Sequence, residues 1–456
     1  MADREKEVII LGAGLVGSLL SIYLAKENFK VKVYEKRADP RGENLDAGRS
    51  INLALSRRGL KALRDVGMEE VVASELIPMT GRIMHDKTGR TNYQPYGQKG
   101  QYINSVSRNG LNTVLTREAL ELGVEFCFDH ICERVDSRTS EIFVRDLKTG
   151  EAFTDSAGLV VGADGAFSAM RRSFQFIPRF EFSQTYLNHG YTELSIPPTD
   201  DGNFALDPNG LHIWPRGNFM FIALPNPDKS FTCTLFYPYE GALSFDSLKE
   251  DQQILDFFED YFPDIIPLIP DLVNEFRKNP IAHLITISSY PWAFNRCLLL
   301  GDASHAIVPF YGQGMNSGFE DCYLFMRLAK DLQFDWDQIL PRFSEERKKD
   351  ADAISQLALK NFIEMRDKVA DKVFLKRKKV EAAIHDLFPS LWVPQYAMVT
   401  FSDHSYSDAA YIGKLQDRIM EENKEIWEDR DPTPADLAML AEKFNDLMTA
   451  SLINHL

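Results

Sequence analysis

The chain has 456 residues, of which 44% are hydrophobic and 26% are charged, and its formal net charge is −16. That length is sufficient for two or three domains with a large core, and the composition is ordinary for a globular protein. The negative charge argues against a nucleic acid or an anionic membrane surface as partner. The five cysteines are an odd number without a CxxC pair, so we expect free thiols, no disulfide framework and no metal site.

The two ends of the chain carry no pattern of a membrane protein. Charged residues 3–7 run directly into an apolar segment, so we expect no signal peptide. No uninterrupted apolar run approaches the roughly 18–20 residues that a transmembrane helix needs. We therefore expect a cytoplasmic protein.

The first landmark is a glycine-rich turn between two apolar strands. Residues 8–11, VIIL, are a short continuous apolar run, which is typical of a parallel strand buried on both faces. GAGLVG follows at 12–17, a helical pattern reaches residue 27, and a second strand at 31–34 ends in an acid. This order is a dinucleotide-binding fingerprint, in which the glycines allow a tight turn, close approach of a pyrophosphate, and helix–strand packing. The residues of this unit that we expect to bind the cofactor are Gly12, Gly14, Leu15, Val16, Gly17, Tyr34, Glu35, Lys36 and Arg37.

Two later strands also end in an acid beside glycine. LVVGADG at 159–165 contains Asp164, and LLLGDASHAIVPFYGQGMN at 298–316 contains Asp302. A dehydrogenase that binds NAD(P) does not need these two acids, whereas a larger cofactor that spans the sheet edge does. A carboxylate can accept hydrogen bonds from sugar or ribityl hydroxyls, and a helix start near residue 314 can stabilise negative charge on a bound ring. The residues expected at this part of the cofactor are Asp164, Asp302, Pro309, Gly312, Gly314, Met315 and Asn316.

GAGLVG, VGADGAFSAMR and GDASHAIVPFYGQGMN resemble the three motifs of the single-component flavoprotein aromatic hydroxylases. The resemblance implies bound FAD, with the first motif at its ADP part and the third at the ribityl chain and isoalloxazine. It also implies NADPH as a co-substrate that binds transiently, without a domain of its own. The flavin carries the chemistry in such enzymes, so no catalytic side chain and no metal are expected. Ala54, Arg108 and Cys132 complete the expected FAD contacts.

The resemblance further implies an α/β fold, in which a Rossmann-like FAD-binding domain of the GR2 type contains an inserted antiparallel-sheet substrate domain. β-branched and aromatic runs between residues 191 and 237, separated by Gly, Pro, Asn and Asp, predict this sheet. PRGN at 215–218 predicts a hairpin within it. We expect the FAD-binding domain to comprise 1–75, 100–177 and 286–345, the substrate domain 76–99 and 178–285, and a C-terminal helical region 346–456 that contributes to the substrate pocket.

Polar residues within apolar stretches are candidates for substrate binding. Asn361 falls on the apolar face of a predicted helix, and a buried amide there serves either a neighbouring backbone group or a ligand. Tyr396 lies among apolar residues in VPQYAMVTFS and is, taken alone, typical of a core tyrosine. Arg82 and Tyr96, taken alone, are typical of a strand-edge arginine and a turn aromatic.

A closer resemblance, from about residue 7 to 405, gives these four residues a common role. PMTGRIMHD, QYINSVSR, LHIWPR, GFEDC and NFIEMR are similar to segments of the kynurenine 3-monooxygenase family. In that family an arginine, two tyrosines and an asparagine hold the amino acid end of L-kynurenine, which implies Arg82, Tyr96, Tyr396 and Asn361 here. Phe310 and Met365 are the candidates for contacts with its ring. The implied reaction uses NADPH and O2 to convert L-kynurenine into 3-hydroxy-L-kynurenine.

The C-terminus departs from part of that family. Eukaryotic members continue into a hydrophobic membrane anchor, whereas this chain ends in a short amphipathic segment opened by Pro432 and Pro434. We expect that segment to dock on its own domain, as in a bacterial-type enzyme. Two alternative functions stay open: a sister flavin hydroxylase of another aromatic amino acid or an anthranilate-like acid, and a flavin-fold binding protein without redox chemistry. The oligomeric state stays open between monomer and homodimer.

Overall fold

A computed structural model of the chain describes residues 6–42, 52–365 and 371–454. Its N-terminal part is built on a six-stranded sheet of order β18-β19-β12-β1-β2-β8. All neighbours in this sheet are parallel except the edge pair of β18 and β19. The carboxyl ends of β1, β12 and β19 therefore lie side by side, and the three motifs follow from these ends. The strands are β1 (Glu7–Leu11), β2 (Lys30–Tyr34), β8 (Glu125–Cys127), β12 (Leu159–Gly162), β18 (Ala293–Phe294) and β19 (Cys297–Leu299).

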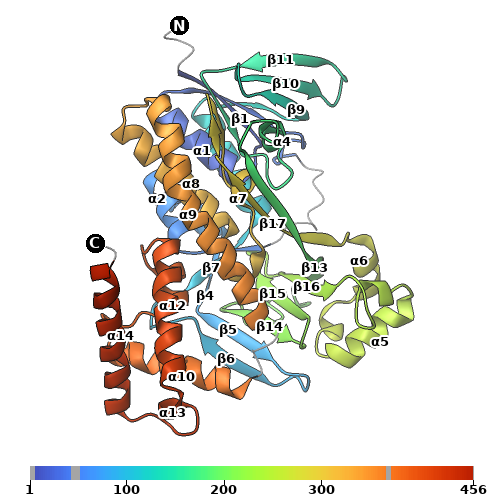
Figure 1. The fold of residues 1–456 in the computed structure, drawn as a ribbon. Coiled ribbons are helices and arrows are strands. Elements are labelled where there is room, and N and C mark those ends of the chain that lie inside the picture. The colour runs from blue at the N-terminus through green and yellow to red at the C-terminus, as the bar shows by residue number, and fades with distance from the viewer. Residues whose placement is uncertain (1–5, 43–51, 366–370, 455–456) are drawn as a thin grey trace.

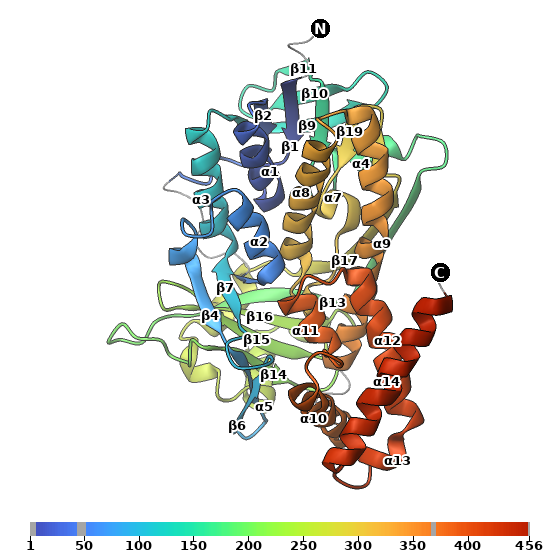
Figure 2. The ribbon, with the colours of Figure 1, turned by 90° about the vertical axis from the view of Figure 1, so that its left-hand side faces the viewer.

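Helices cover one face of this sheet, and a small sheet with a short helix lies on the other (Figures 1 and 2). The covering helices are α1 (Leu15–Lys26), α3 (Arg108–Glu121), α8 (Gly314–Asp331) and the first part of α9 (Trp336–Ile363). The small sheet contains β9 (His130–Asp136), β10 (Glu141–Asp146) and β11 (Ala152–Ser156), next to α4 (Ala169–Phe174). One continuous hydrophobic core joins the six-stranded sheet to its helices and to β9, β10 and α4, as expected for parallel strands that are buried on both faces.

A second sheet has seven strands in the order β17-β13-β16-β15-β14-β5-β6. The predicted hairpin at 215–218 is confirmed, since it joins β14 to β15. The expectation of a wholly antiparallel sheet is wrong at one pair, because β14 and β5 run parallel. A long crossover connects these two strands, and such a connection permits the parallel arrangement. The strands are β5 (Gly81–His85), β6 (Thr91–Pro95), β13 (Glu181–Ile196), β14 (Gly210–Pro215), β15 (Met220–Pro225), β16 (Phe231–Pro238) and β17 (Ala282–Tyr290).

The two faces of the second sheet have different partners. One face packs on α5 (Asp251–Tyr261) and α6 (Leu272–Lys278) in an aromatic-rich core. The other face packs against residues 307–311 and the C-terminal half of α9. A third, three-stranded sheet comprises β3 (Asn52–Leu55), β7 (Ile103–Ser107) and β4 (Leu76–Met79). We propose the domain division predicted above with one change. Residues 76–79, which form β4, are assigned to the FAD-binding domain, because β4 pairs with β7 and not with the second sheet.

Helices form the rest of the chain and gather at one end of the molecule (Figure 1). They are α10 (Lys372–Leu387), α11 (Gln395–Phe401), α12 (Tyr406–Glu422), α13 (Lys424–Trp427) and α14 (Pro434–Asn454). The docking of the last helix is confirmed, because Leu437, Leu440 and Phe444 of α14 are buried in one cluster with Trp392 and Trp427. Across the described ranges, no helix has the length and apolar character needed to cross a membrane.

Two buried imidazoles link β5 to β14. His85 Nε2 lies 2.8 Å from His212 Nδ1, and His212 Nε2 lies 2.9 Å from the carbonyl oxygen of Asp207. Because a carbonyl oxygen only accepts hydrogen bonds, His212 has its proton on Nε2 and accepts at Nδ1 from His85. A second proton on His212 would face the N–H of His85. Burial, with His85 nearby, lowers the pKa of His212 to about 4.

We expect acid to destabilise the protein through His212. Its folded pKa of about 4 lies below the unfolded value of roughly 6.5, so the unfolded chain binds the proton first as the pH falls. The contribution is complete above pH 6.5 and is lost toward pH 4, which amounts to roughly 2.5 kcal/mol between pH 7 and pH 4.5. Urea unfolding of wild type and His212→Gln at both pH values measures it. If the variant loses as much stability as wild type over this interval, the assignment is wrong.

Candidate active site

The glycine turn after β1 is shaped by steric requirements. Gly12 has φ +98°, and a Cβ at this position would lie 2.6 Å from the carbonyl oxygen of Ala163. A Cβ at Gly17 would lie 2.0 Å from the carbonyl oxygen of Gly12, so the fold itself requires both glycines. Gly14 is different, because a Cβ there would meet nothing within 4 Å. Its open side, beside the unpaired N–H groups of the first turn of α1, suits a pyrophosphate.

Glu35 closes this turn from the end of β2. Its Oε2 accepts from the N–H of Ala13 at 2.8 Å, and its Oε1 accepts from the backbone N–H and the Nε of Arg37, both at 2.9 Å. Although burial raises it, these contacts hold the pKa of Glu35 below its usual value. Arg37 Nη2 also lies 3.4 Å from Glu35 Oε2, and this long contact is the one that a ribose hydroxyl would replace on the ionised carboxylate. The Tyr34 hydroxyl donates to Asp155 Oδ2 at 2.7 Å. Lys36 is exposed.

Asp164 lies in the turn before α4. Its Oδ2 accepts from the N–H of Ala169 at 2.7 Å, whereas its buried Oδ1 has no hydrogen-bond partner within the described ranges. Burial raises the pKa of Asp164. Burial and the nearby Asp164 raise the pKa of the Cys132 thiol to about 12, so this thiol is neutral. An orphaned acceptor beside the sheet edge fits a hydroxyl of a bound cofactor.

Asp302 begins α7 (Asp302–His305). Its side chain is exposed to solvent, yet desolvation by the surrounding protein raises the pKa of its carboxyl. The positive charge of Arg108, the first residue of α3, acts in the opposite direction. Asp302 is thus accessible to a ligand although protein atoms surround it on most sides. This environment suits a carboxylate that binds ribityl hydroxyls.

Residues 306–313, between α7 and α8, form what we call the third-motif loop. Gly312 has φ +67° in this loop, and Pro309 is exposed. Asn316, in the first turn of α8, donates from Nδ2 to the carbonyl oxygens of Ala54 at 2.7 Å and Gly312 at 2.8 Å. Its Oδ1 accepts from the N–H of Ser56 at 2.9 Å. The side chain of Asn316 therefore fixes the loop, and a cofactor would meet this residue through its backbone.

The first and third motifs are in direct contact through Val16. A Cβ at Gly301 would lie 3.1 Å from Val16 Cγ2, and one at Gly318 would lie 2.6 Å from the same atom. Gly314 stays open, because the nearest heavy atom to a Cβ there lies 3.9 Å away, and Met315 is buried. The open Gly14, the orphaned oxygen of Asp164 and the exposed Asp302 follow three adjacent strands, an arrangement that fits FAD extended along this sheet edge.

Three of the predicted substrate residues meet although they come from distant parts of the chain. The Arg82 guanidinium on β5 lies 5.3 Å from the ring centre of Tyr96 and 5.0 Å from that of Tyr396 on α11. The two tyrosine rings stack with centres 5.8 Å apart. Although burial lowers it, the two tyrosines raise the pKa of Arg82, so the guanidinium stays charged. The buried Tyr96 hydroxyl has no hydrogen-bond partner of good geometry in the described part of the chain. This arrangement suits a carboxylate ligand.

The other three predicted substrate residues form a neighbouring group. Asn361 Nδ2 donates to the carbonyl oxygen of Phe310 at 2.5 Å and lies 3.5 Å from Met365 Sδ. The Phe310 ring lies 4.4 Å from the ring of Phe362 and 5.0 Å from that of Phe236. The amide nitrogen of Asn361 thus serves a backbone group, which was one of the two alternatives from the sequence. A role toward the ligand stays a proposal.

Tyr311 joins the two groups and was missed in the sequence. It follows Phe310 in the third-motif loop, and its ring stacks on that of Tyr396 with centres 5.6 Å apart. Burial raises the pKa of its hydroxyl, so Tyr311 is neutral. The available signal was a pair of adjacent aromatic residues directly before the GQGMN segment.

Comparisons with known proteins agree with this geometry. Residues 5–358 match the family model described as FAD binding domain. Kynurenine 3-monooxygenase of Cytophaga hutchinsonii is 46% identical over 424 residues, covering 92% of this chain and 94% of that protein. The chain belongs to the kynurenine 3-monooxygenase family. Kynurenine 3-monooxygenase of Sus scrofa is 44% identical over 422 residues, covering 91% of this chain and 88% of that protein.

Membership of the kynurenine 3-monooxygenase family confirms the resemblance inferred from the sequence. It also confirms FAD as the cofactor and a flavoprotein monooxygenase as the class of enzyme. Among solved structures, 2-methyl-3-hydroxypyridine-5-carboxylic acid oxygenase superimposes with a TM-score of 0.65 at 19% identity, covering 85% of this chain and 98% of the other. This likeness supports the fold alone and confirms the predicted fold class.

Proposed function

We propose that the protein hydroxylates L-kynurenine to 3-hydroxy-L-kynurenine with bound FAD, NADPH and O2. The observation that carries the proposal is the cluster of Arg82, Tyr96 and Tyr396, which Tyr311 connects to the third-motif loop. A cation with two tyrosines suits the α-carboxylate of an amino acid substrate, and family membership supports kynurenine as that substrate.

The residues proposed to hold FAD divide its length among the three motifs. The open side of Gly14 and the first turn of α1 hold the pyrophosphate, and Glu35 holds the ribose of the adenosine. Asp302 accepts from the ribityl hydroxyls, and the N-terminal end of α8 faces the ring system with its positive dipole. When bound, FAD supplies the electron transfer and the oxygen chemistry that side chains lack.

The protein's own task is to position the substrate and exclude water. Arg82 holds the carboxylate, and the hydroxyls of Tyr96 and Tyr396 complete its hydrogen bonds. Phe310 and Met365 line the place of the aminoaryl ring, where apolar surfaces exclude water from the reacting atoms. Fixing the amino acid end in this way selects one ring carbon for hydroxylation, since the ring cannot slide along the pocket.

Oxidation of reduced nicotinamide by the FAD-loaded protein tests the proposal. We expect L-kynurenine to increase NADPH oxidation well above the rate without substrate and to yield a product one oxygen atom heavier. Anthranilate, a related acid without the amino acid side chain, is expected to give no such product. NADH in parallel assays tests the inferred preference for NADPH. Hydroxylation of anthranilate in place of L-kynurenine would support the sister-hydroxylase alternative and refute the proposal.

A further inference from the structure

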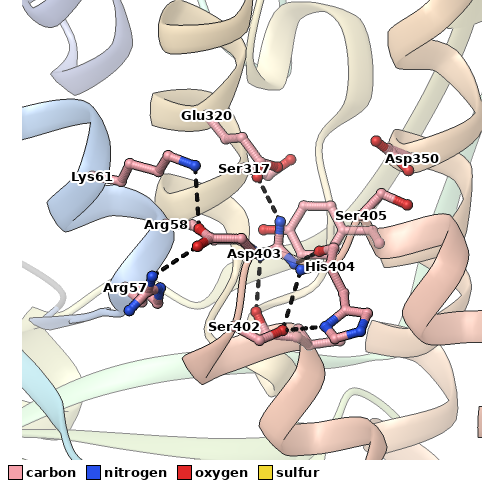
Figure 3. Close-up of polar contacts among 12 residues, drawn as sticks. Arg57, Arg58, Lys61, Ser317, Glu320, Asp350, Ser402, Asp403, His404 and Ser405 are labelled. Carbon is pink, nitrogen blue, oxygen red and sulfur yellow. Dashed lines mark hydrogen bonds and ion pairs between the residues drawn. The ribbon is translucent and has the colours of Figure 1, made fainter. Parts of the chain in front are cut away.

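A buried charged cluster lies between α8, α9 and the C-terminal helices. Figure 3 shows its members Arg58, Glu320 and Asp350 around the segment that leads to α12. The two cations of the cluster are Arg58 on α2 (Arg57–Asp65) and Arg347 on α9, which are only 4% and 3% exposed. None of its members was predicted from the sequence, and none has a part in the cofactor or substrate roles above. The charged cluster consists of Arg58, Arg347, Glu320, Asp321 and Asp350.

Arg58 binds three separate elements. Its Nε donates to the carbonyl oxygen of Val399 on α11 at 2.9 Å, and one terminal nitrogen donates to Glu320 Oε1 on α8 at 2.5 Å. The other terminal nitrogen donates to the carbonyl oxygen of His404, in the segment that leads to α12. Arg58 thus joins α8 to α11, the helix of Tyr396.

Arg347 on α9 pairs with the other two acids of the charged cluster, Asp321 and Asp350. Its Nε donates to Asp321 Oδ1 at 2.7 Å, and Asp321 Oδ2 lies 2.6 Å from His305 Nε2, just before the third-motif loop. Although burial raises it, His305 and Arg347 hold the pKa of Asp321 below its usual value. Asp350 Oδ1 accepts from the N–H of Ser407 at 2.9 Å. Arg347 therefore contacts α8 directly and reaches α12 through Asp350.

Tyr406 is the point where this assembly touches the third-motif loop. Its ring centre lies 4.0 Å from the Arg58 guanidinium and 5.6 Å from that of Arg347. Its hydroxyl donates to Gln313 Oε1 at 2.9 Å, and both side chains are buried. Gln313 lies between Gly312 and the first residue of α8, at the place proposed to face the flavin.

We propose that Tyr406 is a positioning residue that sets the third-motif loop according to the position of α11. Removing one partner of a buried ion pair leaves an uncompensated charge, so elements joined by such pairs move together. Arg58 joins α11 and Tyr406, and the Tyr406 hydroxyl joins this unit to Gln313. A ligand that fixes Tyr396 on α11 then also fixes the loop. The inference rests on the proposed function, because it gives bound L-kynurenine the second task of ordering the flavin-facing loop.

Tyr406→Phe tests the inference, because it removes one hydroxyl while the ring and the charged cluster stay. Tyr23→Phe is the matched control, since the Tyr23 hydroxyl is also buried and donates to the carbonyl oxygen of Ala62 at 2.9 Å, within the FAD-binding part. Gln313→Met removes the same bond from the other side. The double variant of Tyr406 and Gln313 is expected to equal either single variant, because the two share one interaction.

Hydrogen–deuterium exchange of residues 305–317 in the FAD-loaded protein is the main measurement, with and without L-kynurenine. We expect exchange in Tyr406→Phe to be about fivefold faster than in wild type, as for loss of one buried hydrogen bond. L-Kynurenine is expected to protect this segment in wild type and Tyr23→Phe but less in Tyr406→Phe. The ratio of hydrogen peroxide to hydroxylated product is expected to rise in Tyr406→Phe, with KM for L-kynurenine within about twofold of wild type.

Exchange in Tyr406→Phe that equals exchange in Tyr23→Phe, with and without ligand, would overturn the inference. Failure of the wild-type protein to hydroxylate L-kynurenine would instead overturn the proposed function. The exchange of the segment without ligand is independent of substrate identity, so the two failures are distinguishable.

Discussion

Replacement of Arg82 by methionine is expected to lower kcat/KM for L-kynurenine by about 100-fold, mostly through a higher KM, and to leave the FAD content unchanged. A guanidinium that pairs with a carboxylate away from bulk water contributes roughly 3 kcal/mol, which corresponds to a factor of about 100. Methionine keeps a long apolar side chain beside the stacked rings of Tyr96 and Tyr396 and removes the charge. Steady-state kinetics and the flavin spectrum measure the two quantities.

Two further variants distinguish the charge of Arg82, the planar geometry of its guanidinium and its position in the pocket. Arg82→Lys keeps the charge without the planar fork and is expected to fall between wild type and Arg82→Met. Arg90→Met changes an exposed arginine at the end of the turn after the same strand, and its kinetics are expected to stay within about twofold of wild type. Loss of FAD with an unchanged KM in Arg82→Met would place this side chain at the cofactor and contradict its role toward the substrate.

The second large effect is expected for Gly17→Ala. This substitution is expected to abolish FAD binding and to destabilise the apoprotein by several kcal/mol. Its Cβ would lie 2.0 Å from the Gly12 carbonyl oxygen, so α1 and β1 would have to separate, at a cost of about 1–3 kcal/mol or more. The thermal unfolding of the apoprotein and the dissociation constant of FAD measure the two effects.

Gly14→Ala is the matched variant, and it is expected to weaken FAD binding while the stability of the apoprotein changes little. Gly14 has φ −72°, which alanine adopts freely, and its Cβ would meet nothing within 4 Å. We expect the apoprotein to lose less than about 1 kcal/mol, the usual effect of such a change at a helix N-cap. FAD binding is expected to weaken at least tenfold, because the methyl group would occupy the approach of the pyrophosphate. Wild-type FAD affinity in Gly14→Ala would show that the pyrophosphate lies elsewhere.

Much of the cofactor half of the site was predictable because its signals are local. The turn at 12–17 and the acids at 164 and 302 each follow an apolar strand within a few residues, and parallel strands bring their carboxyl ends to one edge. The seven-stranded sheet was predicted except for the parallel pair of β5 and β14, because only tertiary structure decides which strand joins through a crossover. The helical region after residue 345 was also predicted and is confirmed by α9 to α14.

The rest of the site depends on contacts without a local signature. Arg58 and His404 are separated by 346 residues, and nothing near Arg58 in the sequence distinguishes it from a surface arginine of an amphipathic helix. The stacking of Tyr311 on Tyr396 likewise depends on how the third-motif loop meets α11. Arg82, Tyr96, Asn361 and Tyr396 were named through family resemblance. The structure brings Arg82 and the two tyrosines together, with Asn361 in the neighbouring group.

The decisive experiment for hydroxylation of L-kynurenine is anaerobic reduction of the FAD-loaded protein by NADPH. It is done with and without L-kynurenine and is followed by admission of O2 and mass analysis. We expect L-kynurenine to accelerate bleaching of the flavin absorbance, and O2 then to yield 3-hydroxy-L-kynurenine with one oxygen atom taken from O2. A flavin that NADPH reduces equally with and without L-kynurenine, followed by hydrogen peroxide without hydroxylated product, would contradict this expectation.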